Sequence, residues 1–385
     1  MSRWQYSCEQ TGPGTLAGRY MRQFWQPVYR LDDLTAGAAM PLRGMGEDLT
    51  LYRGQSGKPY VVDYRCAHRG TQLSVGRVFG EEIRCMYHGW CYAGNGQCTT
   101  QPGELDKQFT DRVKIKSHPT QSYKGLIFAY MGEGETPKFP EFPELDGEDI
   151  VEARVYQRAT NLTNFIDNQL DEVHVSFTHP ESYSLLPEIP SVAISRTAFA
   201  AVSICSRPGR ADRISEFLMP NILRFKSMTP YEGVNWANSV AWRVPIDDGN
   251  IRSFLVSRYV ATKEGEAAFL ARQKYLNELQ VPDVAAYSRR IRAGELTFEE
   301  AKVEMGEHDP RYDGTLQDHL TMEGQPVVMD RDAETLGIAD TGIIAVRDLW
   351  NEQLADFAKH GKRLVWVQPP PTITTSGEDR QDAAE

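Results

Sequence analysis

The chain has 385 residues, of which 41% are hydrophobic and 25% are charged, and it carries a formal net charge of −11 at pH 7. A chain of this length and ordinary globular composition predicts two domains, and the acidic balance argues against nucleic acid as a partner. No apolar run approaches the roughly 20 residues that a membrane-spanning helix needs, and the first residues lack the apolar core of a signal peptide. We therefore expect a cytoplasmic protein without a membrane segment.

The first third of the chain predicts a small antiparallel β domain. Residues 1–40 are expected to form a helical or irregular lead-in that packs on the second domain, and a first strand begins near Phe24. From about Arg43 to Tyr130, short apolar runs alternate with Gly and Asn-Gly turns, which is typical of short paired strands. We assign this domain to residues 24–135.

The rest of the chain predicts a mixed α+β domain at residues 136–368. Residues 132–147 are rich in Pro, Gly and acidic residues and are typical of a linker. The polar, Pro-rich residues 369–385 predict a mobile tail. Between them we expect a helix over residues 161–179 that Pro180 closes, strands within 191–260, helices within 263–305 and a last helix over 341–361.

Four of the six cysteines lie between residues 66 and 98, and in a reducing compartment such clustering indicates a metal more than disulfides. Cys66 and His68 form one pair of candidate ligands, and Cys85 and His88 form a second. Two thiolates and two imidazoles fit either a tetrahedral zinc ion or a [2Fe–2S] cluster in which two histidines bind one iron. A zinc finger usually groups its cysteines apart from its histidines, whereas here each pair has one of each. The spacing therefore favours the binuclear cluster, with structural zinc as the alternative.

Cys91 and Cys98 are the other two cysteines of this region. They flank Asn95 and Gly96, and Asn-Gly is a strong signal for a tight hairpin turn. We therefore expect a β-hairpin here and interpret these two cysteines as structural.

The segments "CAHRG" and "CMYHGW" resemble the Rieske domain of the ring-hydroxylating oxygenases, with its C-x-H-R-G and C-x-Y-H-G-W pattern. The likeness covers most of residues 20–180, returns near 316–350, and is greatest to the phthalate dioxygenase and aryl O-demethylase branch. It implies the α subunit, or terminal oxygenase component. The implied fold class is α+β, an all-β Rieske domain followed by a catalytic domain with an antiparallel sheet flanked by helices.

The segment "DNQLDEVHVSFTHP" contains a second group of candidate ligands, namely Asp171, His174 and His179. On a helix, Asp171 and His174 lie about 60° apart, whereas His179 can join them only if the helix ends or bulges before Pro180. Two histidines and a carboxylate form the iron site of non-haem Fe(II) oxygenases, although a helix with two histidines is more often explained by packing. The resemblance implies that His174 and His179 bind a mononuclear Fe(II), and that Asp171 connects His174 to His88 of a neighbouring subunit.

The third iron ligand must come from farther along the chain. The segment "LQDHLTMEGQ" resembles the distal acidic motif of the same branch, which implies Asp318. Residues with weaker claims are Asp313, His319, Asp330 and Asp332 as alternative ligands, Glu323 and Gln325 as supporting groups, and Asn164 and Asn168 as lining of the iron pocket.

The chain has no G-x-G-x-x-G motif after a strand and no P-loop, so nothing in it predicts a nicotinamide site. The resemblance implies that a separate flavin and iron–sulfur reductase, or a ferredoxin, relays electrons from NAD(P)H to a homotrimer or a multiple of it. The expected reaction uses O₂ to hydroxylate or O-demethylate an aromatic, acidic small molecule. The alternatives are N-demethylation of a non-aromatic amine or alkaloid, and a non-catalytic electron carrier with a binding domain.

Three arginines in "SRPGRADR" form a cluster in the region where a substrate pocket is expected. Arg207, Arg210 and Arg213 could bind a substrate carboxylate through their planar guanidinium groups. A solvated loop is the interpretation that we favour for this cluster.

Overall fold

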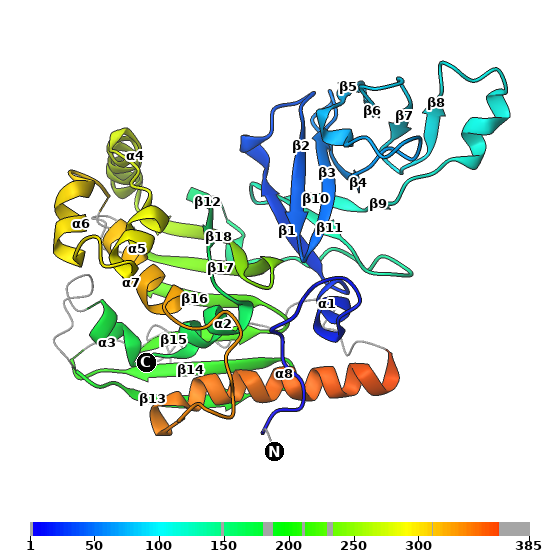
Figure 1. Ribbon diagram of the computed structural model, residues 1–385. Coiled ribbons are helices and arrows are strands. Elements are labelled where there is room, and N and C mark those ends of the chain that lie inside the picture. The colour runs from blue at the N-terminus through cyan, green and yellow to red at the C-terminus, as the bar shows by residue number, and fades with distance from the viewer. Residues whose placement is uncertain are drawn as a thin grey trace, which may run out of the picture.

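The computed structural model describes residues 3–147, 150–179, 188–209, 212–228, 234–309 and 311–361. Over these residues the chain forms an amino-terminal β domain and a larger domain in which helices cover an antiparallel sheet (Figure 1). The expected α+β fold class is therefore confirmed. The expected tail at 369–385, Pro180 and Arg210 lie outside the described residues.

The amino-terminal domain contains three small antiparallel sheets, preceded by helix α1 (Leu16–Met21). The first sheet has the order β1-β11-β10, from β1 (Trp25–Arg30), β10 (Thr120–Tyr123) and β11 (Leu126–Tyr130). The second has the order β2-β3-β4-β9, from β2 (Ala39–Gly44), β3 (Glu47–Arg53), β4 (Pro59–Asp63) and β9 (Ser117–His118). The third joins β5 (Arg77–Phe79), β6 (Glu82–Arg84), β7 (Cys91–Ala93) and β8 (Cys98–Thr100) in chain order. Strands β7 and β8 pair as the hairpin that the Asn-Gly turn predicts.

A seven-stranded antiparallel sheet forms the centre of the second domain. Its order is β12-β18-β17-β16-β15-β14-β13. The strands are β12 (Ile150–Arg158), β13 (Ser191–Arg196), β14 (Ala200–Ser206), β15 (Arg213–Leu218), β16 (Ile222–Met228), β17 (Val234–Asp247) and β18 (Asn250–Ala261). The strands predicted within 191–260 are therefore confirmed, and β12 is added at the edge next to β18.

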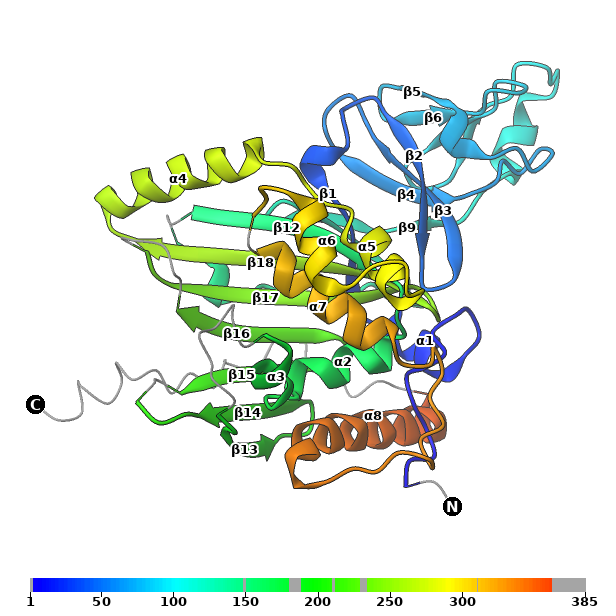
Figure 2. The same cartoon turned by 60° about the vertical axis from the view of Figure 1, so that its left-hand side comes forward.

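Helices α2, α3 and α7 lie over one face of this sheet (Figure 2). The helices of this domain are α2 (Leu162–Leu170), α3 (His174–Thr178), α4 (Lys263–Glu278), α5 (Val284–Arg292), α6 (Phe298–Met305), α7 (Arg311–Glu323) and α8 (Thr341–His360). The predicted last helix is confirmed as α8, and Gly361 follows it with a φ of 63°, a left-handed conformation that glycine adopts without strain. Among the described residues, no helix is both long and apolar enough to cross a membrane.

The prediction of one continuous helix over 161–179 is wrong, because the chain breaks it at Asp171. This residue has an extended backbone, with φ −86° and ψ 91°, and it ends α2. Its carboxylate Oδ1 then accepts the backbone N–H groups of Val173 and His174, each at 3.1 Å. Asp171 therefore supplies a partner for the N–H of His174, the first residue of α3, and for the N–H of Val173 just before it.

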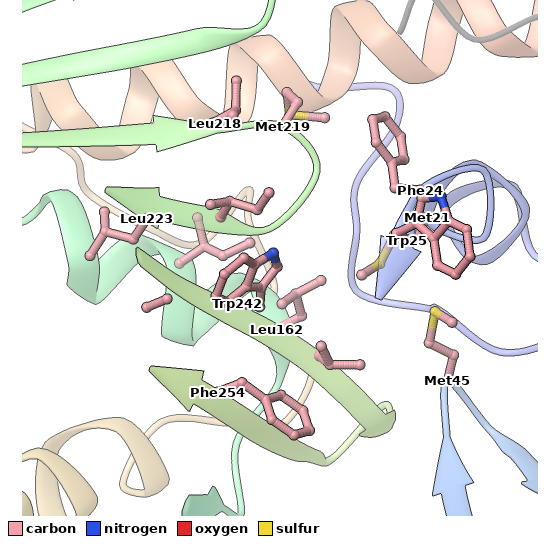
Figure 3. Close-up of a cluster of buried hydrophobic side chains, with 14 of the residues drawn as sticks. Met21, Phe24, Trp25, Met45, Leu162, Leu218, Met219, Leu223, Trp242 and Phe254 are labelled. Atoms are coloured by element: carbon pink, nitrogen blue, oxygen red, sulfur yellow. The ribbon is translucent and has the colours of Figure 1, made fainter. Parts of the chain in front are cut away.

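The Pro-rich segment 132–147 connects the domains but is packed rather than free. Phe142 is fully buried, and its ring meets Trp242 edge-on at 5.1 Å between centroids. Phe128 of β11 contacts the same indole at 5.3 Å. Figure 3 shows Trp25 and Met45 of the amino-terminal domain beside Trp242 of the sheet. The two domains consequently share one hydrophobic core.

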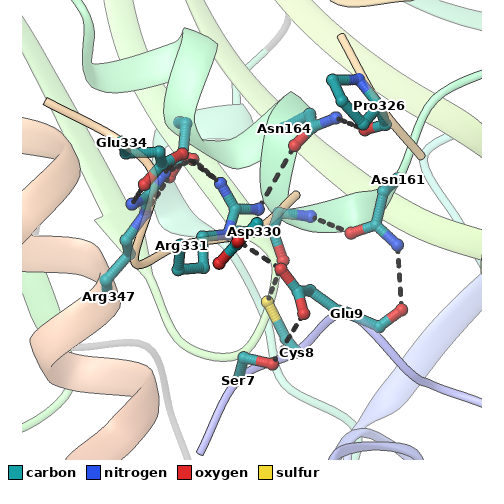
Figure 4. Close-up of polar contacts among 12 residues, drawn as sticks. Ser7, Cys8, Glu9, Asn161, Asn164, Pro326, Asp330, Arg331, Glu334 and Arg347 are labelled. Atoms are coloured by element: carbon teal, nitrogen blue, oxygen red, sulfur yellow. Dashed lines mark hydrogen bonds and ion pairs between the residues drawn. The ribbon is translucent and has the colours of Figure 1, made fainter. Parts of the chain in front are cut away.

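A buried ionic network ties the amino-terminal segment to the second domain (Figure 4). Arg331 donates to Glu9 at 2.8 Å and to Glu334 at 2.6 Å. Arg347 of α8 donates to Glu334 and to Asp167 of α2. Because the three carboxylates surround two guanidinium groups, each buried charge has a partner of opposite sign.

The close approach of α8 to α2 predicts a stability effect at Gly342. A methyl group added there would lie 2.3 Å from the carbonyl oxygen of Leu170, so Gly342→Ala must push the two helices apart. We expect a loss of about 1–3 kcal/mol, measured as a lower urea midpoint of unfolding. Gly12→Ala is the control, because no heavy atom lies within 4 Å of the added carbon. Equal midpoints for the two variants would contradict the tight contact.

Candidate metal centres

Two loops of the amino-terminal domain present the candidate cluster ligands. One loop begins at Cys66 after β4, and the other begins at Cys85 directly after β6. In both loops a glycine four residues later donates its N–H to the cysteine carbonyl, Gly70 at 2.9 Å and Gly89 at 3.1 Å. Both glycines have a positive φ, 75° and 74°, which side chains disfavour. The two loops are therefore built on the same turn.

The loops bring two thiols and two imidazoles together at one end of the domain. Both cysteine side chains are buried, and Sγ of Cys66 lies 3.2 Å from the hydroxyl of Tyr92. The rings of His68 and His88 are 4.5 Å apart between centroids. Trp90 stacks on His68 at 4.6 Å with an interplanar angle of 7°. These are the four residues that the sequence singles out.

This donor set fits a [2Fe–2S] cluster. Burial raises the pKa of the Cys66 thiol, so a thiolate at this position needs a nearby cation. The buried Nδ1 of His68 has no hydrogen-bond partner among the described residues, which leaves it free to bind a metal. One Cys and one His per loop is the ligand set of a Rieske cluster. The neighbouring Met86 and Tyr87 are 62% and 58% exposed, so this end of the domain faces solvent.

The second centre combines residues from α3 and α7. His174 begins α3, His179 follows its last residue, and Asp318 comes from α7. One ligand atom from each of the three residues lies within 4.8 Å of the others. Nε2 of His179 and Oδ1 of Asp318 are 3.0 Å apart, which matches adjacent ligand positions around a metal with bonds of about 2.1 Å. Two histidines and one carboxylate suit Fe(II) and leave positions open.

Hydrogen bonds on the far ring nitrogens orient both imidazoles. Nδ1 of His179 lies 2.8 Å from Oε1 of Gln317, and Nδ1 of His174 contacts the carbonyl oxygen of Asp171. When each Nδ1 carries the proton, each Nε2 is available to a metal. Gln317 was missed at the sequence level, although its position next to Asp318 could have drawn attention to it.

Arg158 of β12 fixes the charge state of Asp318. Its Nη2 donates to Oδ2 of Asp318 at 3.1 Å. Burial would raise the pKa of Asp318, but the hydrogen bond from His179 and the nearby Arg158 guanidinium lower it to about 2. Burial also opposes protonation of His179, but Asp318 raises the pKa of that imidazole, whereas burial lowers the pKa of His174. Arg158 precedes Asp318 by 160 residues, and no sequence signal connected the two.

Asp171 lies beside His174 but does not join the group of three. Its Oδ1 caps α3, and no hydrogen bond to Oδ2 is found among the described residues. The carboxylate can therefore keep the cap with one oxygen and present the other to a partner.

The alternative ligands in the distal motif have other contacts. Nδ1 of His319 lies 2.6 Å from Oε1 of Glu323, and Ser288 donates to the second oxygen of Glu323 at 2.9 Å. Asp313 faces His308 at 3.1 Å, and Asp330 accepts the N–H of Asp332. Glu323 therefore anchors α7 to α5, so the structure uses it as a support of the helix that carries Asp318.

The two asparagines proposed for the pocket make local contacts. Asn164 donates to the carbonyl of Pro326 at 2.9 Å, and Asn168 accepts from Gln169 at 3.2 Å. Neither bond reaches the group of three residues.

The favoured interpretation of "SRPGRADR" as a solvated loop is wrong for Arg207. Its guanidinium donates to the carbonyl of Glu172 and to the hydroxyl of Ser176, each at 3.2 Å. Arg213 lies 3.6 Å from the Glu172 carboxylate. Both arginines therefore support the turn between α2 and α3.

Comparison with known proteins agrees with this geometry. Residues 24–119 match the family described as Rieske [2Fe-2S] domain. The chain is 32% identical over 276 residues, 64% of its length, to a phenoxybenzoate dioxygenase subunit alpha of Ectopseudomonas oleovorans. It is 33% identical over 173 residues, 44% of its length, to the 5,5'-dehydrodivanillate O-demethylase oxygenase subunit of a Sphingobium species. These matches span 66% and 41% of the two relatives, less than two thirds of either.

Solved structures share the two-domain fold. NdmB of Pseudomonas putida CBB5 superposes with a TM-score of 0.66 at 21% identity, covering 88% of this chain and 93% of NdmB. The reduced complex between oxygenase and ferredoxin in carbazole 1,9a-dioxygenase gives a TM-score of 0.57 at 20% identity, covering 86% of this chain and 89% of that one. Residues 24–119 of the chain therefore form a Rieske [2Fe-2S] domain, the relatives that the chain resembles are named as oxygenase subunits, and the solved structures share its fold.

Proposed function

We propose that this chain is the terminal oxygenase component of a multi-component Rieske oxygenase. It uses O₂ and electrons relayed from NAD(P)H by a separate reductase to hydroxylate or O-demethylate an aromatic, acidic small molecule. The observation that carries the proposal is the convergence of His174, His179 and Asp318 in a chain that also holds the cluster loops. An electron carrier needs only the cluster, so the second ligand group favours an oxygenase.

The residues around the second centre orient its ligands and keep its carboxylate ionised, as metal binding requires. When bound, the cluster supplies electrons singly and Fe(II) supplies the centre at which O₂ is activated. His174, His179 and Asp318 would hold the iron. Gln317 and the carbonyl of Asp171 keep the imidazoles turned toward it, and Arg158 keeps Asp318 ionised at neutral pH.

Electron delivery is proposed to run between two copies of the chain. Within one chain, the β6–β7 end of the amino-terminal domain and α3 lie at opposite sides of the molecule (Figure 1). A homotrimer, or a multiple of it, would let the exposed His88 of one copy face Asp171 of the next. The uncommitted Oδ2 of Asp171 could then bond that histidine while Oδ1 continues to cap α3.

The balance of buried charge supports an acidic substrate. Arg158 and Arg243 are both buried on the face of the sheet that α2 covers. Among the residues that the structure describes, the hydrogen bonds of Arg243 go to neutral groups, the Tyr156 hydroxyl at 3.1 Å and Oε1 of Gln169 at 2.6 Å. Asp318 pairs with Arg158, so Arg243 has no carboxylate as a hydrogen-bond partner within the described part of the chain. Because an unpaired buried charge is costly, the region favours a ligand with a carboxylate.

A separate electron donor is proposed as the partner. The chain has no nicotinamide motif, and an oxygenase of the same fold is known in complex with a ferredoxin. The exposed Met86 and Tyr87 beside the cluster loops offer a surface for such a donor.

Spectroscopy and turnover test the proposal. Anaerobically reconstituted protein should show a Rieske EPR signal after reduction and a high-spin Fe(II) adduct with nitric oxide. Oxygen uptake with NADH and a reductase is then compared for methoxybenzoates, phthalates and methylated amines. Uptake with the acidic aromatics supports the proposal, and uptake restricted to the amines supports N-demethylation. A cluster signal without the nitric oxide adduct supports the electron carrier.

Removing one iron ligand should empty only the second centre. His174→Ala is expected to lower the iron content from about three to about two per chain and to abolish turnover. The visible spectrum of the cluster should remain, because its ligands lie in the other domain. His360→Ala, at an exposed histidine on α8, is the control and should retain all the iron. Full iron content in His174→Ala would exclude it as a ligand.

Neutralising Asp171 should slow electron delivery without removing either metal. The amide oxygen of Asp171→Asn can still accept the N–H groups that α3 needs, so only the charge is lost. We expect turnover to fall roughly 10- to 100-fold with both EPR signals intact, and single-turnover reoxidation of the cluster to slow equally. Normal reoxidation would contradict the bridge between copies.

A further inference from the structure

Arg207, directly after β14, contacts both sides of the turn that carries Asp171. One of its Nη2 partners is the carbonyl oxygen of Glu172, which lies in the turn between α2 and α3, at 3.2 Å. The other is the hydroxyl of Ser176 in the first turn of α3, also at 3.2 Å. The same guanidinium donates through Nη1 to Sγ of Cys205 at 2.9 Å. One side chain from the sheet therefore spans the segment in which His174 lies.

Glu172 strengthens this contact from within the turn. The residue is only 2% exposed, and its carboxylate oxygens have no hydrogen-bond partner among the described residues. The nearest cation is Arg213 of β15, at 3.6 Å. A buried carboxylate without such a partner is strongly destabilising. The ion pair between Glu172 and Arg213 therefore holds the turn against β15.

Two side chains therefore hold the turn. Oδ1 of Asp171 accepts the N–H groups of Val173 and His174 at the start of α3. Arg207 donates to the carbonyl of Glu172 and to the hydroxyl of Ser176. Helix α3 has only five residues, and so short a helix has little stability of its own. The position of the first iron-binding histidine therefore depends on contacts from outside the helix.

We propose that Arg207 is a positioning residue of the iron centre, acting with Glu172 and Arg213 as a clamp between the sheet and the α2–α3 turn. The inference rests on the proposed function and adds a role that no sequence motif indicated. Arg207 acts through the turn and through His174 without touching the reacting atoms. Both of its Nη groups are engaged in holding protein groups, so a substrate carboxylate is not its partner.

Two substitutions at Arg207 test the clamp in the holoenzyme. Arg207→Gln removes the positive charge and the planar guanidinium group. Arg207→Lys keeps the charge, but its ammonium group cannot bond both acceptors in the same way. Arg290→Gln is the matched control, because it breaks an exposed arginine–glutamate pair between α5 and α6. Three measurements are compared: the EPR spectrum of the nitric oxide adduct, the rate of iron loss to a chelator, and the thermal midpoint.

We expect Arg207→Gln to change the shape of the nitric oxide EPR signal and to lose iron about tenfold faster, with an unchanged cluster spectrum. Arg207→Lys should lose iron about threefold faster, and the control should match the wild type. A role in stability alone would lower the thermal midpoint and leave the EPR shape unchanged, and this result would overturn the inference. If Arg207→Gln does not accumulate, wild-type iron retention in Arg207→Lys would overturn it equally.

The same experiment separates this inference from the proposed function. If the wild-type protein gives no nitric oxide adduct, the oxygenase proposal itself fails and the clamp fails with it. If the wild type gives the adduct and the Arg207 variants match it in both spectrum and iron loss, only the clamp is wrong.

Discussion

The candidate iron centre depends on the way Asp171 interrupts a helix. In an unbroken helix, His174 and His179 would point roughly 140° apart and could not bind one ion. Asp171 ends α2 and caps a new helix that has only five residues, so His174 stands at its start and His179 just past its end. The two imidazoles can then converge on Asp318. The same residue that breaks the helix is the one proposed to bond His88 of the next copy, so Asp171 is proposed to serve both the geometry of the centre and the path of the electrons.

Buried carboxylates are the second constraint on the fold. Arginines of the sheet pair with those near the candidate iron centre. Asp318 is paired with Arg158 of β12, and Glu172 faces Arg213 of β15. Away from the centre, Asp167 is paired with Arg347 in the network under the amino-terminal segment. Each pair joins a helix, or the turn between α2 and α3, to a strand or to another helix, so these ion pairs also fix the layers of the domain relative to each other.

The hydrophobic core that the two domains share fixes the positions of the two candidate metal centres relative to each other within one chain. Phe128 from the amino-terminal domain and Phe142 from the connecting segment meet the same indole of the sheet, Trp242. Because a ring of the amino-terminal domain and a ring of the connecting segment pack against this one indole, neither domain can rotate without disrupting the contact. This packing leaves the cluster loops exposed at one end of the molecule and α3 over the sheet (Figure 1). The proposal of electron transfer between copies rests on this separation within one chain.

The sequence alone determined whatever is encoded over short distances along the chain. The four cluster residues lie in two loops whose turns are set by nearby glycines, so their spacing was sufficient to predict the cluster. The β7–β8 hairpin and α8 were predictable for the same reason, because a turn dipeptide and a regular apolar pattern act locally. His174 and His179 were predicted as ligands from the family resemblance of their segment, although the continuous helix expected around them was wrong.

Only the tertiary structure decided which distant groups meet the two histidines. Asp318 lies 139 residues from His179, and Arg158 lies 160 residues from Asp318. Arg207, which directly follows β14, lies 35 residues from Glu172. These contacts arise from the register of seven strands and from the packing of α7 over them, and no local pattern encodes that register. The sequence was therefore sufficient to predict the kind of metal site. Long-range packing determined which residues complete and support it.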